Sequence, residues 1–572
     1  MNRIVWTASA VVGGMMGTVA CAQVGVMPGV IRTFEADEGA VSRKYSVEYS
    51  QERRERQGAL RAQQLAELGA MDWGSMGVAD RIDAVLMRNE IERREAHARR
   101  AWARFESAAA WVPFKGVVVE LARGRRDGLR ANAEADAGKL AGMKGEIEGA
   151  KAKFLEDLKE KDGKPGLTPT ECRQIQNLVE GVKWHLGDWY RFSAGYDPVF
   201  TWWCEEPYRA ANKALEDYAR VVKERGVGIT EATPDVIVGT PIGREGLVEE
   251  LGFEFVPYTP EELLAIGERE HQWCLAEMKK AAAEMGLGED WRAALERVKT
   301  MHVGPGEQPT LIRELAEEAV VFLRERDLLT IPKLAEETWR VEMMSPERQK
   351  VSPFFLGGEE IIVSFPTDGM SHEQKMMSMR GNNRHFSRAT VHHELIPGHH
   401  LQQFMNARHM QHREVFSTPF WTEGWALYWE TRMWDLGFAQ SPENKMGMLF
   451  WRNHRCARIV FSLKYHLGEM SPQQCIDYLV DQVGHERANA EGEVRRSVAG
   501  GYGPLYQVAY MMGGLQFRSL HKELVGGGRM TEKEFHDAVL REANMPVELV
   551  RAALTGEMVE RDRRAAWRFD GR

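Results

Sequence analysis

The chain has 572 residues, of which 43% are hydrophobic and 28% charged, with a formal net charge of −9. Such a chain can bury a large core, and its length allows roughly three or four domains of ordinary size. The lack of a basic excess argues against a protein that tracks nucleic-acid phosphates, so no nucleic-acid partner is expected.

Residues 1–22 have the pattern of an export signal. Arg3 precedes an uncharged apolar stretch, and Ala-Cys-Ala at its end fits the small-x-small pattern of signal-peptidase cleavage. Two alternatives stay open: an apolar N-terminal helix of the mature protein, and lipidation at Cys21, since Thr-Val-Ala-Cys loosely resembles a lipobox. No later stretch is apolar enough to span a bilayer. We expect an exported protein, periplasmic or secreted, with a lipid anchor at Cys21 as an option.

The rest of the chain is predicted to be mainly helical. Residues 23–40 form a Gly/Pro-bearing leader for which poor order is expected. Residues 42–107 indicate two helices broken near 72–77, and residues 131–161 another. Thr-Pro-x-Glu at Thr168 and at Thr259 begins two long helices, because the threonine caps, the proline takes the first helical position and the glutamate reaches back.

Strand signals are few and short. They lie at Phe253–Val256, Glu342–Met344 and Ile361–Phe365, and the Gly357-Gly358 turn predicts a small antiparallel pair near the candidate site. No linker divides the chain. We therefore expect a large multi-helix fold around a cleft, with an N-terminal helical lobe at 41–330 and a second lobe at 331–572.

Cysteine is sparse and offers no thiolate metal site. Once Cys21 is removed five cysteines remain, and no CxxC pair occurs among them. In an oxidising compartment one or two disulfides are possible, and Cys456 with Cys475 is the pair worth testing.

The stretch Val391–Met405, VHHELIPGHHLQQFM, carries the strongest chemical signal. Eight of the 17 histidines lie between His372 and His412, and neutral imidazole is the commonest protein metal ligand. The alternative is a cluster of hydrogen-bonded core or surface histidines. The clustering, with Glu394 inside it, favours a metal site.

The spacing differs from HExxH, in which two histidines four residues apart share one helical face. In a straight helix His399 would be rotated by about 120° from His393, and His400 would stand about 10 Å further along the axis. Pro397 and Gly398 weaken the helix here, because proline lacks an N–H and glycine tolerates unusual backbone angles. We predict a bulge that brings His399 to the metal beside His393, and prefer His399 to His400.

The third ligand is predicted in Thr422–Glu430, TEGWALYWE. Glu423 follows His399 by 24 residues and lies in the first turns of a helix after Pro419. Glu430 is seven residues further on, hence on the same face about 10 Å away, where it can orient a ligand histidine. The aromatic residues of this segment are expected to pack behind that face.

These two motifs resemble the bacterial family of domain of unknown function 885, with its HExxPGHHxQ and EGWAxYxE signatures. Three further segments are similar to RlxxDxxxH, EVxRY and QAxxYxxG of that family: Arg458–His466, Glu493–Arg496 and Gln507–Gly513. The resemblance covers about residues 56–559. Its site plan is similar to helical zinc peptidases of the thimet-oligopeptidase and carboxypeptidase Taq kind.

The resemblance implies a helical fold around a cleft and zinc-dependent peptide hydrolysis. By position it assigns one Zn²⁺ to His393, His399 and Glu423, and catalysis to Glu394. The chain departs from the family pattern at Ser462, where the family has Asp, and at Ser497, where it has Tyr.

The supporting residues are assigned as follows. Tyr510 is the preferred donor to the oxyanion, with His466 as the second choice. Arg496 is placed to grip a substrate carboxylate, the alternative being an ion pair with Glu491 or Glu493. Substrate-binding or ligand-supporting roles are also expected for His400, Tyr506 and Glu430.

The sequence thus predicts a zinc metallopeptidase that cleaves short peptides with a water molecule activated by Glu394. Two other functions stay open. One is a zinc hydrolase of a non-peptide amide or ester, because the same water attacks any polarised carbonyl. The other is an inactive binding protein of the same fold.

Overall fold

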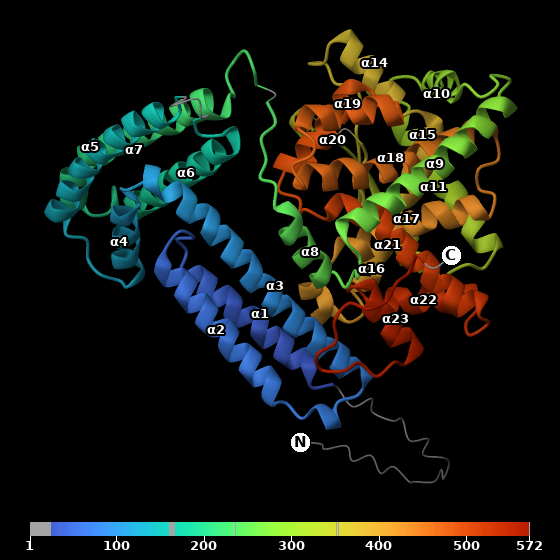
Figure 1. Ribbon diagram of the computed structural model, residues 1–572, viewed down its shortest axis with the longest axis horizontal. Helices are drawn as coiled ribbons and strands as arrows, with labels where there is room; N and C mark the ends of the chain where they lie inside the picture. Colours follow the sequence, from blue (N-terminus) through green and yellow to red (C-terminus); the bar gives the residue numbers. More distant parts are fainter. Residues whose placement is uncertain (1–24, 160–165, 235, 350–351, 353, 571–572) are drawn as a thin grey trace, which may run out of the picture.

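The computed structural model describes residues 25–159, 166–234, 236–349, 352 and 354–570 (Figure 1). The predicted signal peptide and Cys21 lie outside these residues. The described part contains 23 α-helices and one pair of strands, which confirms the mainly α fold.

Three N-terminal helices lie side by side and lead into the rest of the molecule (Figure 1). They are α1 Met27–Lys44, α2 Gln51–Ala70 and α3 Val78–Ala108. The poorly ordered leader expected at residues 23–40 is therefore wrong from Met27 onward. The reason is the spacing of Met27, Ile31 and Phe34, which places three buried apolar side chains on one helical face.

Helices α4 to α7 form a separate lobe with its own apolar core, at the left of Figure 1. They are α4 Lys115–Arg126, α5 Ala133–Asp157, α6 Pro169–Ser193 and α7 Pro198–Val221. The predicted capping box at Thr168 is confirmed, since its hydroxyl accepts from the Glu171 N–H and the Glu171 carboxylate accepts from the Thr168 N–H.

The remaining helices form the main body, which carries the candidate site. They are α8 Gly243–Phe253, α9 Pro260–Glu284, α10 Trp291–Lys299, α11 Gln308–Glu325, α12 Lys333–Thr338, α13 Pro346–Gln349, α14 His372–Gly381, α15 Arg384–Glu394, α16 His399–Asn406, α17 Pro419–Asp435, α18 Pro442–His466, α19 Pro472–Val483, α20 Arg487–Ala499, α21 Tyr506–His521, α22 Glu532–Glu542 and α23 Val547–Thr555. The capping box predicted at Thr259 is confirmed at the start of α9.

The two large cores do not divide at residues 330 and 331. Helices α9 to α11 contribute Met278, Leu295 and Leu323 to the core of the main body, and α1 and the first half of α3 join the same core. Helix α3 is 31 residues long and ends in the core of the α4–α7 lobe at Ala108. Helix α3 is about 46 Å long and connects the two cores.

The small sheet is parallel, so the predicted antiparallel pair is wrong. Strand β1 Arg340–Met343 pairs with β2 Glu360–Val363, with Val341 opposite Ile361. A parallel pair requires a crossover, and the connection containing α13 supplies it. The Gly357-Gly358 turn folds Leu356 back onto Ile362 in a single antiparallel bridge.

Two smaller expectations also fail. Residues 253–256 form the end of α8 and a turn with Phe255 at φ 54°, not a strand. The five described cysteines are buried and free, so Cys456 and Cys475 are not paired.

Helices α17 and α21 approach closely through glycine. A Cβ built on Gly513 would lie 2.1 Å from the carbonyl oxygen of Phe420, and one on Gly424 would lie 2.5 Å from Gly513 Cα. Without side chains the two backbones can meet. This contact brings Tyr506 and Tyr510 of α21 next to Glu423 of α17.

Replacing Gly513 with Ala is expected to destabilise the protein by about 3 kcal/mol, because backbone atoms of α17 must move to admit the methyl group. Urea denaturation followed by tryptophan fluorescence measures the change. Gly145→Ala is the matched control, since nothing lies within 4 Å of its added Cβ in helix α5. There alanine should stabilise by up to about 1 kcal/mol. Equal stability of Gly513→Ala and the parent would contradict the contact.

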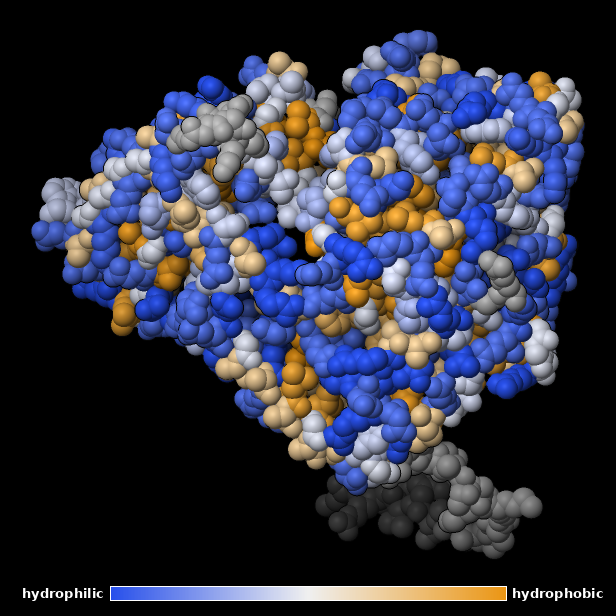
Figure 2. Space-filling model, in the orientation of Figure 1, coloured by the Kyte–Doolittle hydropathy of each residue, from blue (hydrophilic) through white to orange (hydrophobic). Residues whose placement is uncertain are grey.

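On the face shown in Figure 2 the surface is mostly hydrophilic, with apolar residues in small groups. Among the described residues no helix has the length and apolar character needed to cross a bilayer.

Candidate metal centre

The helix predicted over residues 391–405 is broken at the site of the expected bulge. Helix α15 ends at Glu394 and α16 begins at His399, with a cis peptide bond between Ile396 and Pro397. Across the break the Gly398 N–H reaches back to the carbonyl oxygen of His392 at 3.1 Å, six residues earlier in place of the four of an α-helix, so two residues are absorbed there as expected.

Gly398 is the position that allows this path. A Cβ at this residue would lie 1.8 Å from the carbonyl oxygen of His393, a distance that only the absence of a side chain permits. Trp425 of α17 stabilises the break, because its indole N–H donates to the carbonyl oxygen of Pro397 at 2.8 Å. The rings of His393 and His399 are thereby brought to 4.8 Å between centroids.

His393, His399 and Glu423 form a buried group whose ligand atoms all lie within 4.8 Å of one another. Glu423 Oε2 lies 3.5 Å from Nε2 of His393 and 3.2 Å from Nε2 of His399. His400 does not join them, because its Nε2–H donates to the carbonyl oxygen of Ala335 at 2.6 Å. The structure thus places His399 in the group and turns His400 away.

Each histidine is oriented through its other nitrogen. His393 Nδ1–H donates to Glu430 Oε1 at 2.6 Å, and His399 Nδ1–H donates to Gln402 Oε1 at 3.1 Å. Both Nε2 atoms are left for a metal ion, and such partners fix the orientation of a ligand histidine. Gln402 was not singled out in the sequence, although its position three residues after His399 on one helix face was the available signal.

Replacing Glu430 with Gln is expected to weaken metal binding by about 10- to 100-fold, because the amide keeps the shape and loses the charge that supports His393. Competition with a chromophoric chelator measures the affinity. The exposed Glu373→Gln variant is the control and should bind metal like the parent. Unchanged affinity in Glu430→Gln would show that the carboxylate does not support the ligand.

The electrostatics of the group favour a positive charge at its centre. Burial alone would raise the pKa of Glu423 and lower that of His399, but their mutual attraction prevails. The pKa of Glu423 falls well below its ordinary value and the pKa of His399 rises to about 9. Glu423 Oε2 is also buried and accepts no hydrogen bond of good geometry from the described residues. Two imidazoles and one carboxylate with an open side are a donor set that suits zinc.

A second group of metal-ligating residues, His521, Glu532 and His536, is less suited to a metal. Arg432 already donates to Glu532, and Tyr428 is hydrogen-bonded to Nε2 of His536 at 2.8 Å. Two of its three ligands therefore already have partners.

Glu394 lies beside the first group without belonging to it. Its Oε2 is 4.0 Å from Nε2 of His399, and the backbone at Gly357 covers its other side so closely that a Cβ there would lie 2.3 Å from Oε2. Burial raises the pKa of Glu394 above its ordinary value, against the attraction of His393 and His399. A carboxylate in this setting suits a general base.

Two tyrosines of α21 close the group on another side. The Tyr506 hydroxyl donates to Glu423 Oε1, and the Tyr510 ring stacks on His393 with 6.1 Å between centroids and 12° between planes. Both rings line the pocket.

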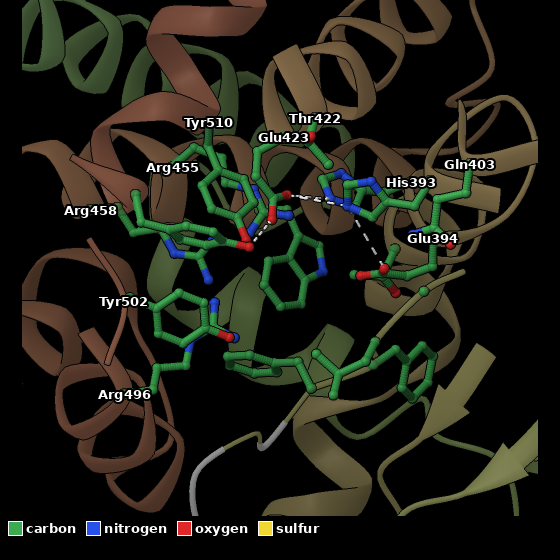
Figure 3. Close-up of a pocket in the computed structure, with 18 of the residues that line it drawn as sticks. His393, Glu394, Gln403, Thr422, Glu423, Arg455, Arg458, Arg496, Tyr502 and Tyr510 are labelled. Atoms are coloured by element: carbon green, nitrogen blue, oxygen red, sulfur yellow. Dashed lines mark hydrogen bonds and ion pairs between the residues drawn. The ribbon is translucent and has the colours of Figure 1, made fainter. Parts of the chain in front are cut away.

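The pocket has a volume of about 260 Å³ and is lined by the ligand group, Glu394 and both tyrosines. Figure 3 labels His393, Glu394, Glu423 and Tyr510 among them. Arg496 also lines the pocket, and it forms an ion pair with Glu493 at 2.9 Å. Its position therefore agrees with both expectations, a contact with a substrate carboxylate and an ion pair with Glu493. Sequence reasoning gave no individual role to the other lining residues: Arg348, Phe354, Phe355, Leu356, Gly357, Thr390, Gln403, Thr422, Trp451, Arg455, Arg458 and Tyr502.

His466 is not brought to the pocket. It is the last residue of α18, eight residues beyond Arg458, which does line the pocket, and this is about 12 Å along a helix. His466 is buried there, and burial lowers its pKa to about 4. The geometry therefore does not support His466 as the second-choice donor to the oxyanion.

Ser462 and Ser497, where the chain departs from the family pattern, lie outside the pocket lining. Ser462 donates weakly to the carbonyl oxygen of Pro504 at 3.4 Å, and Ser497 accepts from Gln507 at 2.6 Å. The aromatic residues of α17 pack as expected, with Trp421, Trp425, Tyr428 and Trp429 buried.

The fold and the site together define a large helical protein with a buried His-His-Glu group that could hold a metal ion. The chain belongs to the family described as bacterial protein of unknown function DUF885, which matches residues 35–554. No curated protein matches the sequence.

Two solved structures share the fold. A candidate lipoprotein of unknown function from Shewanella oneidensis has 17% identity and a TM-score of 0.68, over 92% of this chain and 99% of its own. A candidate lipoprotein from Colwellia psychrerythraea has 14% identity and a TM-score of 0.57, over 93% of this chain and 98% of its own. At these identities the likeness concerns the fold alone.

Proposed function

We propose that the protein is a zinc-dependent hydrolase, namely a metallopeptidase that cleaves short peptides. The observation that carries the proposal is the buried group of His393, His399 and Glu423 with the carboxylate of Glu394 beside it. Three protein ligands with one open position are typical of catalytic zinc, whereas structural zinc has four protein ligands.

The residues divide the work of hydrolysis. Zinc, when held by the three ligands, supplies Lewis-acid activation of a water molecule and of the scissile carbonyl. Glu394 takes the proton of the attacking water and delivers it to the leaving amine. Tyr510 donates to the carbonyl oxygen as negative charge develops on it.

Other residues keep this arrangement in place. Glu430 and Gln402 hold the two imidazoles, and Tyr506 holds the Glu423 carboxylate. Because these groups are buried, bulk water is excluded and each electrostatic contact is strengthened.

We also propose that the protein is exported from the cytoplasm. The pattern of residues 1–22 supports an exported protein, periplasmic or secreted. A lipid anchor at Cys21 is the variant to which the solved neighbours, described as candidate lipoproteins, lend support.

A panel of short peptides with free and blocked ends, incubated with and without a chelator, tests the function. Zinc near one equivalent per chain and chelator-sensitive cleavage are expected. Zinc without cleavage of any peptide, but with cleavage of simple amides or esters, would favour the non-peptide hydrolase. No bound metal and no turnover would favour an inactive binding protein.

A further inference from the structure

Arginines gather on one side of the pocket. Figure 3 shows Arg455, Arg458 and Arg496 together at the left, across the cavity from Glu394. All three are buried, with 4%, 2% and 6% of their surface exposed. Burying a guanidinium is costly unless its charge is compensated, so each positive charge requires a partner.

The carboxylates near these arginines are too few to neutralise all three positive charges. Arg455 is paired with Glu430 at 3.1 Å, but Arg458 and Arg496 share one carboxylate, that of Glu493, at 2.6 and 2.9 Å. Glu493 is fully buried beneath them. One positive charge is therefore left over at the wall of the pocket.

Arg458 also has donor capacity to spare. Its Nε donates to Glu493 at 2.6 Å, while its buried Nη1 has no hydrogen-bond partner among the described residues. The guanidinium is held in position because it stacks 4.2 Å from the centroid of the Tyr510 ring. Arg496 lies 5.3 Å from the centroid of Tyr502, a ring that also lines the pocket. An oriented guanidinium with free N–H groups matches a carboxylate, which can accept two parallel hydrogen bonds.

We propose that Arg458 and Arg496 form a subsite for the free C-terminal carboxylate of the substrate, so that the enzyme is a carboxypeptidase that removes short fragments. The inference rests on the proposed function and specifies its substrate. Hydrolysis adds one water across the peptide bond: the oxygen goes to the acyl carbon, and the protons go to the amine of the released fragment.

The distance from the arginine to the ligand group limits the fragment. The centroid of the Tyr510 ring is 4.2 Å from the guanidinium carbon of Arg458 and 6.1 Å from the ring centroid of His393, and these two contacts set an upper bound on the separation of Arg458 and His393. An extended chain covers about 3.5 Å per residue, so a carboxylate at Arg458 leaves room for about one to three residues. The cavity of about 260 Å³ is small enough to agree with this limit.

Binding can be measured without turnover in the zinc-loaded Glu394→Gln protein. Isothermal titration with a set of N-acetyl tripeptides, each as free acid and as C-terminal amide, compares the two chain ends directly. The acids should bind on the order of 10- to 100-fold more tightly, since a charged hydrogen-bond pair is lost in the amide. Equal binding of acids and amides, or no binding of the acids at millimolar concentration, overturns the subsite.

Substitutions to lysine in the same Glu394→Gln background locate the subsite. Arg458→Lys and Arg496→Lys keep the positive charge beside Glu493 but lose the paired N–H donors of the guanidinium. Each should reduce the ratio of acid to amide affinity by about tenfold. Arg452→Lys is the matched control. Arg452 lies on the same helix with Glu270 at 2.9 Å and does not line the pocket, so the ratio should not change. An unchanged ratio in both pocket variants assigns acid preference elsewhere and overturns the proposal.

Hydrolysis by the parent protein separates the two proposals. Cleavage of the free acids but not of the amides supports both. Equal cleavage of acids and amides overturns the subsite and leaves the peptidase in place. Acid-selective binding with no cleavage of any peptide keeps the subsite and overturns the peptidase.

Discussion

Replacement of Glu394 with Gln is expected to lower kcat for peptide hydrolysis by about 10²- to 10⁴-fold, because the amide has the same shape but cannot accept the proton of the attacking water. Glu394 is not in the ligand group, and its Oε2 lies 4.0 Å from Nε2 of His399. The zinc content should therefore stay at that of the parent. Steady-state kinetics and metal analysis on the same preparation measure both.

The exposed Glu373→Gln variant is the control for this experiment, since it makes the same chemical change on the surface. It should keep the activity of the parent. Retained turnover in Glu394→Gln would reject the general-base assignment, whereas loss of zinc together with activity would place Glu394 among the ligands.

Replacement of Gly398 with Ala is expected to remove the metal and to destabilise the protein by about 3 kcal/mol. The added Cβ would lie 1.8 Å from the carbonyl oxygen of His393 and 2.7 Å from that of His392. These are backbone atoms at the end of α15, so the break must rearrange, and overpacking of this kind costs about 1–3 kcal/mol or more. His399, the next residue, would then leave its place beside Glu423. Zinc stoichiometry and urea denaturation measure the two effects.

Two variants keep this test decisive. Gly369→Ala is the matched control, because its Cβ would meet nothing within 4 Å, and it should keep zinc and stability. His399→Ala removes the ligand without touching the backbone, and it should lose zinc while the fold persists. Full zinc content in Gly398→Ala at unchanged stability would show that the close approach at Gly398 is not needed.

The sequence predicts an element correctly where the contacts that stabilise the element lie within it. The capping boxes at Thr168 and Thr259 involve atoms three residues apart, so the sequence specifies both helix starts. The interruption at Pro397-Gly398 follows in the same way from a missing N–H and a missing side chain. The poor order expected for residues 23–40 is wrong from Met27 onward, because Met27, Ile31 and Phe34 stabilise a helix only when other helices cover them.

Residue order is enough to predict that the chain is mainly helical, that the helix is interrupted at Pro397-Gly398, and that Glu430 shares a face of α17 with Glu423, because helical periodicity and proline chemistry are local. The grouping of Glu423 with His393 and His399 joins different helices, and it was expected from the paired motifs and their resemblance to a family. Packing between distant elements sets the parallel pairing of the sheet, the position of His466 outside the pocket lining, and the meeting of Arg458 and Arg496 over one carboxylate. Those depend on how α18, α20 and α21 pack around the pocket, and such contacts between distant residues have no signature in sequence spacing.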